Sequence, residues 1–184
     1  MKDLFKEISP ESITDNPFKL IGKDWMLITA GAMSGFNTMT ASWGGVGVLW
    51  GRNVCFCFIR PVRHTFQFME KAGQFTLSFF TEDHRKALNF CGANSGRSVD
   101  KPKACGLTPQ ETADGMVSFK EARMIFECKK LYFHDFDPAR FIDPAIEKKL
   151  SRQRLSPDVY RRNKAVFDEN RIDTDVFRGD RITG

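Results

Sequence analysis

The sequence lacks several features that would point to particular classes of protein. It has no apolar run near the roughly 20 residues that a membrane span needs. Its first 20 residues are polar and lack the apolar stretch of a signal peptide. It also has no Cys-x-x-C pair and no cluster of cysteine and histidine with zinc-binding spacing. We therefore expect a cytoplasmic protein with no membrane contact and no bound metal.

Cysteine and charge are also limited. The five cysteines, an odd number, fit reduced thiols, and we interpret Cys55 and Cys57 in VCFCFI as small buried hydrophobic residues. The net charge is only +5, and the basic residues form no stripe interleaved with aromatics. This pattern argues against nucleic acid and favours a small anionic ligand.

Two nucleotide-binding motifs are missing as well. Neither G-x-G-x-x-G nor G-x-x-x-x-G-K-[ST] occurs, and Gly44, Gly45 and Gly47 do not have that spacing. We interpret these glycines as a bulge or a close approach of two backbones. No nucleophile, base and orienting group can be combined into a triad, so no catalytic residue is assigned.

What the chain does contain is a series of strand patterns. Its 184 residues, 41% of them hydrophobic, suffice for one domain with a core. Strands are predicted over 25–31, 36–50, 51–61, 74–80 and 116–137, and short helices over 63–73 and 82–92. Asp83 is the expected N-cap of the second helix, with Gly92 past its end. Several antiparallel strands joined by short helices indicate a small barrel.

The stretch FNTMTASWG carries the first candidate site. On a strand Thr38, Thr40 and Ser42 point to one side, and the residues between them to the other. A polar face could supply hydrogen bonds to a flat heteroaromatic ligand. A strand facing solvent explains the same residues equally well.

Two further polar segments could bind an anion. In IRPVRHTF, Arg60 and Arg63 flank a proline just before a helix that begins at His64 or Thr65, a combination suited to phosphate. Ordinary surface basicity is the alternative. In ANSGRSVDK, a loop after a helix could close over an anion, although a solvated loop accounts for it as well. Its candidate residues are Ser95, Gly96, Arg97 and Lys101.

Together, NTMTASWGGVGVLW, FIRPVRHTFQFMEKAGQFTLSFF and CGANSGRSVDK with the following GLTP resemble the flavin reductase-like family, in particular its flavoredoxin branch. The resemblance runs from about Trp25 to Glu147. It implies a mainly β fold with short helices, the Greek-key FMN-binding split β-barrel. It also implies a homodimer that binds FMN and accepts hydride from NADH or NADPH, with electrons passing to an acceptor or a redox partner protein. A non-catalytic electron carrier is the alternative.

The resemblance also implies which residues contact the flavin. Those near the ring are Asn37, Thr38, Met39, Thr40, Ala41, Ser42 and Trp43. Those on the phosphate side are Arg60, Arg63, His64 and Thr65, with Ser95, Gly96, Arg97 and Lys101 as weaker matches. Ser98 stands where this branch has an acidic residue. Hydride chemistry belongs to the flavin, so the protein needs only to position it and to stabilise developing negative charge.

The C-terminal segment departs from this pattern. We divide the chain into a split-barrel domain, 1–148, and a tail, 149–184, that holds seven arginines, as many as residues 1–150 together. If 147–150 are encoded GAA AAA AAA CTA, deleting one A allows a frame that reads EKNYPDKDYHRMYIGEIKQCLTKIE and then stops. This resembles the missing family ending. We therefore hypothesise a frameshift, a poorly packed tail, a missing last strand and, as a third functional alternative, a damaged gene product.

Overall fold

The computed structural model describes residues 5–146 and the backbone of 164–174. The strands are β1 (Lys6–Ile8), β2 (Met26–Ala32), β3 (Gly35–Ala41), β4 (Gly44–Leu49), β5 (Arg52–Ile59), β6 (Gln74–Phe79), β7 (Pro109–Glu111), β8 (Val117–Phe119), β9 (Met124–Asp135) and β10 (Lys164–Thr174). The helices are α1 (Pro17–Lys19), α2 (Thr65–Lys71), α3 (Arg85–Ala93) and α4 (Lys101–Cys105). Short helical turns are η1 (Pro10–Ser12), η2 (Leu20–Asp24), η3 (Glu82–His84) and η4 (Pro138–Arg140). The mainly β class with short helices is confirmed.

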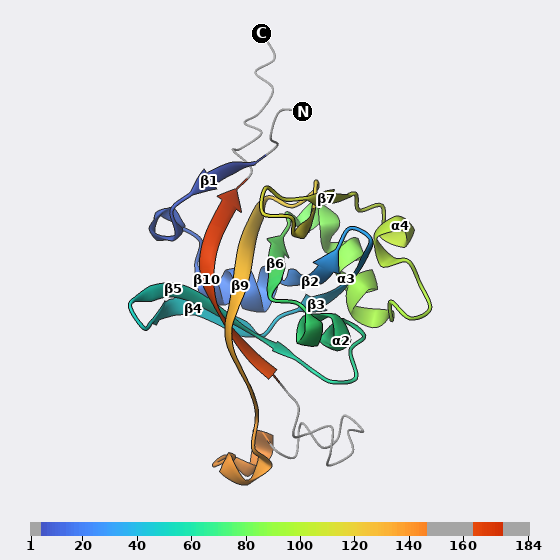
Figure 1. Ribbon diagram of the computed structural model, residues 1–184. Helices are drawn as coiled ribbons and strands as arrows, with labels where there is room; N and C mark the ends of the chain where they lie inside the picture. Colours follow the sequence, from blue (N-terminus) through green and yellow to red (C-terminus); the bar gives the residue numbers. More distant parts are fainter. Residues whose placement is uncertain (1–4, 147–163, 175–184) are drawn as a thin grey trace.

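The main sheet has eight strands and curls almost into a barrel (Figure 1). Its order is β3-β2-β6-β9-β10-β5-β4, with β1 paired to β10. The two strands at the ends of this order, β3 and β4, are consecutive in the chain and separated only by Ser42 and Trp43. So short a link brings both ends of the sheet together without pairing them in this order. The barrel is therefore split where the link lies.

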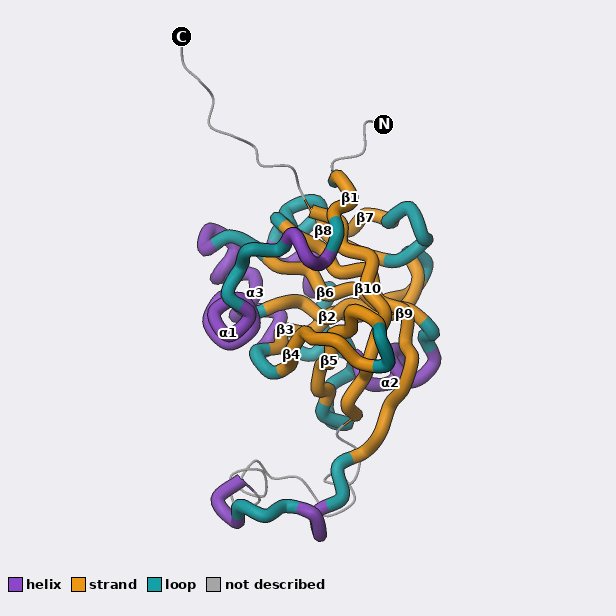
Figure 2. The backbone as a smooth tube through the Cα atoms, turned by 90° about the vertical axis from the view of Figure 1, so that its left-hand side faces the viewer, coloured by secondary structure: helices purple, strands orange, loops and turns teal. Residues whose placement is uncertain are grey.

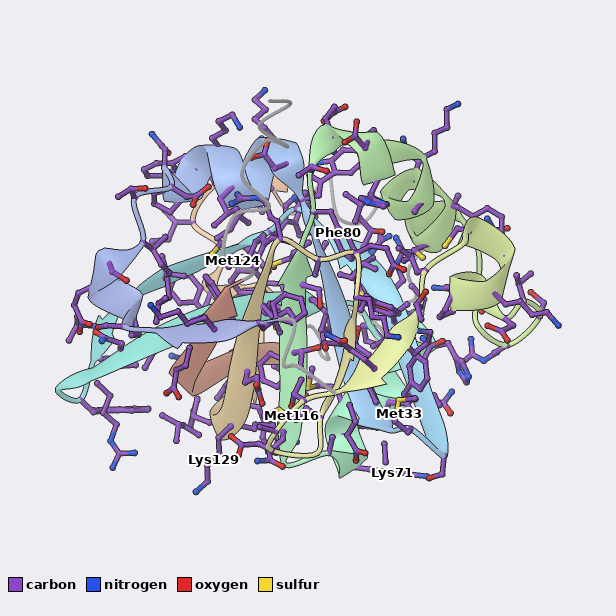
Figure 3. The ribbon with its side chains drawn as sticks, turned by 90° about the horizontal axis from the view of Figure 1, so that it is seen from above. Met33, Lys71, Phe80, Met116, Met124 and Lys129 are labelled. Carbon is purple, nitrogen blue, oxygen red and sulfur yellow. The ribbon has the colours of Figure 1, made fainter. Side chains whose placement is uncertain are left out.

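Side-chain alternation divides the interior into two clusters. Met26 and Ile28 of β2 point into the barrel with Phe75, Leu77 and Phe79 of β6, as the sequence predicts for the β6 residues. Leu27, between them, packs on the other face of β2 beneath α3. Figure 2 shows the strands in the centre with α3 beside them. Phe80, which belongs to the same cluster as Leu27, is labelled in the view from above (Figure 3).

The two predicted helices form, and the second differs from the prediction at both ends. In α2, Phe66 and Met69 share the buried face, as predicted. In α3, Asp83 does not cap the helix, because it lies in the turn η3 that precedes it. Gly92 lies inside α3 rather than beyond its end. A Cβ at Gly92 would lie 3.4 Å from the Cβ of Thr40, so this glycine allows α3 to lie close to β3.

The glycines after Trp43 allow close packing, as one of the two interpretations predicts. A Cβ at Gly44 would lie 2.6 Å from the backbone carbonyl oxygen of Phe56 on the neighbouring strand β5, and a Cβ at Gly45 would overlap the Phe56 ring. Gly47 has no such neighbour. No helix in the described part of the chain is both long and apolar enough to cross a membrane.

The prediction that the last strand is missing is wrong, because the backbone of 164–174 forms the strand β10. β10 pairs antiparallel with β9 along its whole length and with β5 from Lys164 to Glu169. Both neighbours carry backbone groups that need hydrogen-bond partners, and a backbone ladder does not require apolar alternation in the strand that supplies them. The rest of the predicted tail, 149–163 and 175–184, lies outside the described residues. The frameshift and the domain boundary therefore stay predictions.

Candidate functional site

A cavity of about 250 Å³ opens at the split of the barrel. Its wall is formed by the end of β3, the link to β4, and the segment that follows β5. The lining residues are Met39, Thr40, Ala41, Ser42, Trp43, Phe58, Arg60 and Arg63. Seven of these belong to the predicted set, and no carboxylate is among them. The topology thus brings the first two predicted segments together in one electropositive cavity.

The hydroxyls of the β3 segment do not form one ligand-facing row. The Thr38 hydroxyl is buried, accepts a hydrogen bond from the Thr29 hydroxyl (2.9 Å) and donates to the Ile28 carbonyl (3.2 Å). The Thr40 hydroxyl donates to the Leu88 carbonyl in α3. The strand therefore uses two hydroxyls to join its neighbours. Ser42, in the link, lines the cavity.

Asn37 connects the strand to the start of α2. It is buried, and its amide donates to the Thr65 hydroxyl over 2.6 Å, bridging β3 and a helix that begins 28 positions later. Gly96 packs on the same amide, and a Cβ at Gly96 would overlap it. Asn37 and Thr65 thus hold the site's elements in place rather than line the cavity.

Arg63 is the most constrained cation of the cavity. Its Nη1 donates to the Gly92 carbonyl, and its Nε is buried with no hydrogen-bond partner among the described residues. Burial, and then the neighbouring Arg60, lower the pKa of the Arg63 guanidinium. Two like charges that line one cavity are stabilised by an anion, and a guanidinium group is suited to bind one.

His64 lies on the other side of the α2 start. It lines a second cavity of about 360 Å³ with Gly31, Gly35, Gln67, Phe68, Lys71 and Ala72. Lys71 lies at the lower edge of the molecule in Figure 3. Its ring meets the Phe68 ring edge-on at 5.2 Å. Burial, followed by the charges of Arg97 and Lys101, lowers the pKa of His64. His64 does not line the first cavity.

The loop between α3 and α4 packs against the site without lining the first cavity. Lys101 is buried, and its ammonium donates to the Thr38 carbonyl (2.8 Å) and the Cys91 carbonyl (3.0 Å). Arg97 is exposed, and its backbone N–H donates to the exposed Ser95 hydroxyl. Lys101 therefore ties three elements together, while Ser95 and Arg97 stay at the surface.

The sequence analysis missed Phe58. In β5 the residues Cys55, Cys57 and Ile59 are buried, so Phe58 shares the opposite face with Arg60. This alternation places Phe58 beside a predicted site residue and could have identified it. In the described residues no three His, Cys, Asp or Glu side chains form a group suited to a metal.

Comparison with protein families gives a match to the flavin reductase like domain over residues 19–138. This range contains both cavities and the α3–α4 loop, and it ends before the predicted tail. A comparison with curated proteins gives no significant match.

Solved structures share the fold. An FMN-binding domain of a flavin reductase-like enzyme from Shewanella baltica has a TM-score of 0.65 at 15% identity, covering 95% of this chain and 80% of that one. Flavoredoxin of Desulfovibrio vulgaris has a TM-score of 0.59 at 18% identity, covering 90% and 74%. NADH:FAD oxidoreductase from Streptomyces globisporus has a TM-score of 0.58 at 13% identity, covering 80% and 72%. The split-barrel fold is therefore confirmed.

Proposed function

Because this chain belongs to the flavin reductase-like family, we propose that it is an FMN-binding oxidoreductase. In this proposal it takes hydride from NADH or NADPH and passes electrons on to an acceptor. The observation that carries the proposal is the cavity at the split, where Arg60 and Arg63 line a wall without carboxylates. A phosphate group would accept hydrogen bonds from these guanidinium groups and relieve the repulsion between Arg60 and Arg63.

The residues present fit the cofactor in chemical type. Trp43 and Phe58 offer aromatic surface to a planar ring, and Ser42 offers a hydroxyl. When bound, FMN supplies hydride and electron-transfer chemistry. The protein's own task is to hold and orient: the arginines at the phosphate, Ser42 and the aromatic residues at the ring. The bonds made by Asn37 fix these elements before the ligand arrives.

The cavity at the split is partly open, and its volume is small for a cofactor site. The cavity of about 250 Å³ is smaller than the roughly 300–1,000 Å³ of typical small-molecule sites. We therefore include a homodimer in the proposal, with a second copy covering the remainder. Exposed aromatic and branched side chains offer a surface for it. They lie on the β4–β5 hairpin, on β9 and just after β9, namely Val48, Trp50, Tyr132, Phe133 and Phe136. Light scattering tests this, because a monomer at micromolar concentration would contradict the dimer.

An absorption experiment separates the candidate functions. The purified protein is mixed with FMN, freed of oxygen, and given NADH or NADPH. Rapid bleaching of bound flavin supports the enzyme, whereas yellow flavin reduced only by a partner protein supports the electron carrier. A colourless, aggregating protein supports the damaged gene product. Making the protein both as written and with the one-base correction tests whether the tail causes that failure.

A further inference from the structure

Two cysteines outside the cavity lie close together at the junction of α3 and α4. Cys91 is buried in α3, and Cys105 is the last residue of α4 and only partly buried. Their sulfurs are 3.8 Å apart, although 14 positions separate them in the chain. We propose that Cys91 and Cys105 form a redox-active thiol pair that low-molecular-weight disulfides, such as glutathione disulfide, convert to an intramolecular disulfide. This inference goes beyond the flavin function and does not depend on it.

Hydrogen bonds to backbone carbonyls hold the segments that carry the two cysteines in place. The Lys101 ammonium donates to the Cys91 carbonyl, which fixes the end of α3 against the start of α4. The Cys105 thiol donates to the Lys101 carbonyl at 2.9 Å, one helical turn earlier. Gly106 then ends α4 in the left-handed conformation, with φ of +73°. The Cys91 backbone and the Cys105 sulfur are therefore both held by hydrogen bonds to Lys101.

The remaining movement is small. A disulfide needs a sulfur separation of about 2.0 Å, so the two atoms must approach by roughly 1.8 Å. Rotation of the less buried Cys105 side chain can supply most of this, since it exchanges a thiol hydrogen bond for the new covalent bond. The bond would close both ends of the loop that carries Ser95, Gly96 and Arg97.

A second pair in the same molecule shows why access matters. The sulfurs of Cys55 and Cys128 are closer, 3.6 Å apart, but both residues are at most 1% exposed in the barrel core. A dissolved oxidant cannot reach them without unfolding. Cys105 has an exposed edge, so the pair with the longer separation is the one expected to react.

The reaction balances as two thiol–disulfide exchanges. Cys105 loses its proton and attacks glutathione disulfide, forming a mixed disulfide and releasing one glutathione. Cys91 loses its proton and attacks the Cys105 sulfur, forming the intramolecular bond and releasing the second glutathione. The protein is oxidised by two electrons, and the two protons end on the released thiols. Burial raises the pKa of Cys105 and, to about 12, that of Cys91, so both thiols are protonated near neutral pH.

Mass spectrometry of the full chain tests the proposal directly. The protein is incubated with glutathione disulfide, the remaining thiols are alkylated, and the product is digested with trypsin without reduction. Arg97 and Lys103 separate the two cysteines into different peptides, 87–97 and 104–120. We expect these peptides to be linked and the intact mass to fall by two hydrogen atoms. Persistent glutathione on Cys105, alkylation of both cysteines, or a link only between Cys55 and Cys128 would each overturn the proposal.

Stability and a variant give independent readouts. The oxidised protein should unfold about 5–10 °C higher than the reduced protein, because the bond restricts the unfolded chain. Reduction with dithiothreitol should restore the original midpoint. Cys105→Ser should abolish both the link and the shift, whereas Cys55→Ser should retain both. A linked protein with an unchanged or lower midpoint would contradict the near-disulfide geometry.

Discussion

The middle of β3 and the link that follows this strand both carry polar residues but use them differently. Asn37 and Thr38, in the middle of the strand, are buried, and their side chains form hydrogen bonds with neighbouring elements. Ser42 and Trp43, in the link at the split, line the cavity instead. The polar residues in the middle of the strand therefore hold neighbouring elements together, whereas those in the link form part of the cavity wall. The predictions below separate these two roles.

Replacing Asn37 should cause the largest loss of stability. Asn37→Leu keeps the number of side-chain heavy atoms but leaves the Thr65 hydroxyl without its 2.6 Å donor. We expect the free energy of unfolding to fall by about 2 kcal/mol, because a buried polar partner is left unsatisfied. Urea denaturation measures this. Ser42→Ala is the matched control and should change stability by less than about 0.5 kcal/mol. Equal losses in both variants would contradict the division of roles.

Replacing Arg63 should give the largest loss of ligand affinity. Arg63→Ala removes the buried Nε and one of two cations in the cavity. If FMN binds there through its phosphate, its dissociation constant should rise about 10- to 100-fold, the value of one charge-assisted hydrogen bond. Quenching of flavin fluorescence measures this. Arg140→Ala, which alters an exposed arginine paired with Asp137, is the control. Unchanged FMN affinity in folded Arg63→Ala would place the phosphate elsewhere.

Ser42→Ala should have a smaller effect on the ligand. A neutral hydrogen bond contributes about 0.5–1 kcal/mol, which corresponds to a roughly 2- to 5-fold loss of FMN affinity. The same titration measures it, with Thr38→Ser as a comparison that retains the buried hydroxyl. If Thr38→Ser weakened FMN binding more than Ser42→Ala did, the middle of β3 would belong to the binding wall after all.

Much of the fold follows from local sequence pattern. The alternation in QFTLSFF predicts the buried face of β6, and glycine and turn residues mark most strand ends. The helix boundary near Asp83 was wrong because Asp83 lies inside a 3-10 turn that precedes α3, and such turns are frequent at the start of α-helices. β10 was missed because its pairing is made by the backbone between two distant strands, which no local periodicity encodes.

The candidate site was predictable in part for a similar reason. Resemblance identified seven residues that line the cavity, and alternation along β5 could have added Phe58. The hydroxyls of β3 that bond to other parts of the protein are determined by where β2 and α3 lie. This depends on tertiary structure, which a local sequence pattern does not give.

The frameshift hypothesis is tested by a different measurement, the nucleotide sequence. Codons at 147–172 that cannot be read in the alternative frame would refute it.

The smallest expected effect is a pH dependence at His64. Its pKa lies below the ordinary value of 6.5 because of burial and the charges of Arg97 and Lys101. Between this lowered pKa and 6.5 the unfolded chain binds a proton that the folded chain does not. The free energy of unfolding should therefore fall as the pH decreases through that window. Urea midpoints from neutral to mildly acidic pH measure the slope.

Three variants test this pH dependence. His64→Gln should remove part of the slope, whereas His134→Gln, at an exposed position on β9, should retain it. Arg97→Gln should raise the pKa of His64 toward its ordinary value, because one of the opposing charges is lost. If His64→Gln left the slope unchanged, the α2 start would carry no titrating group in this range.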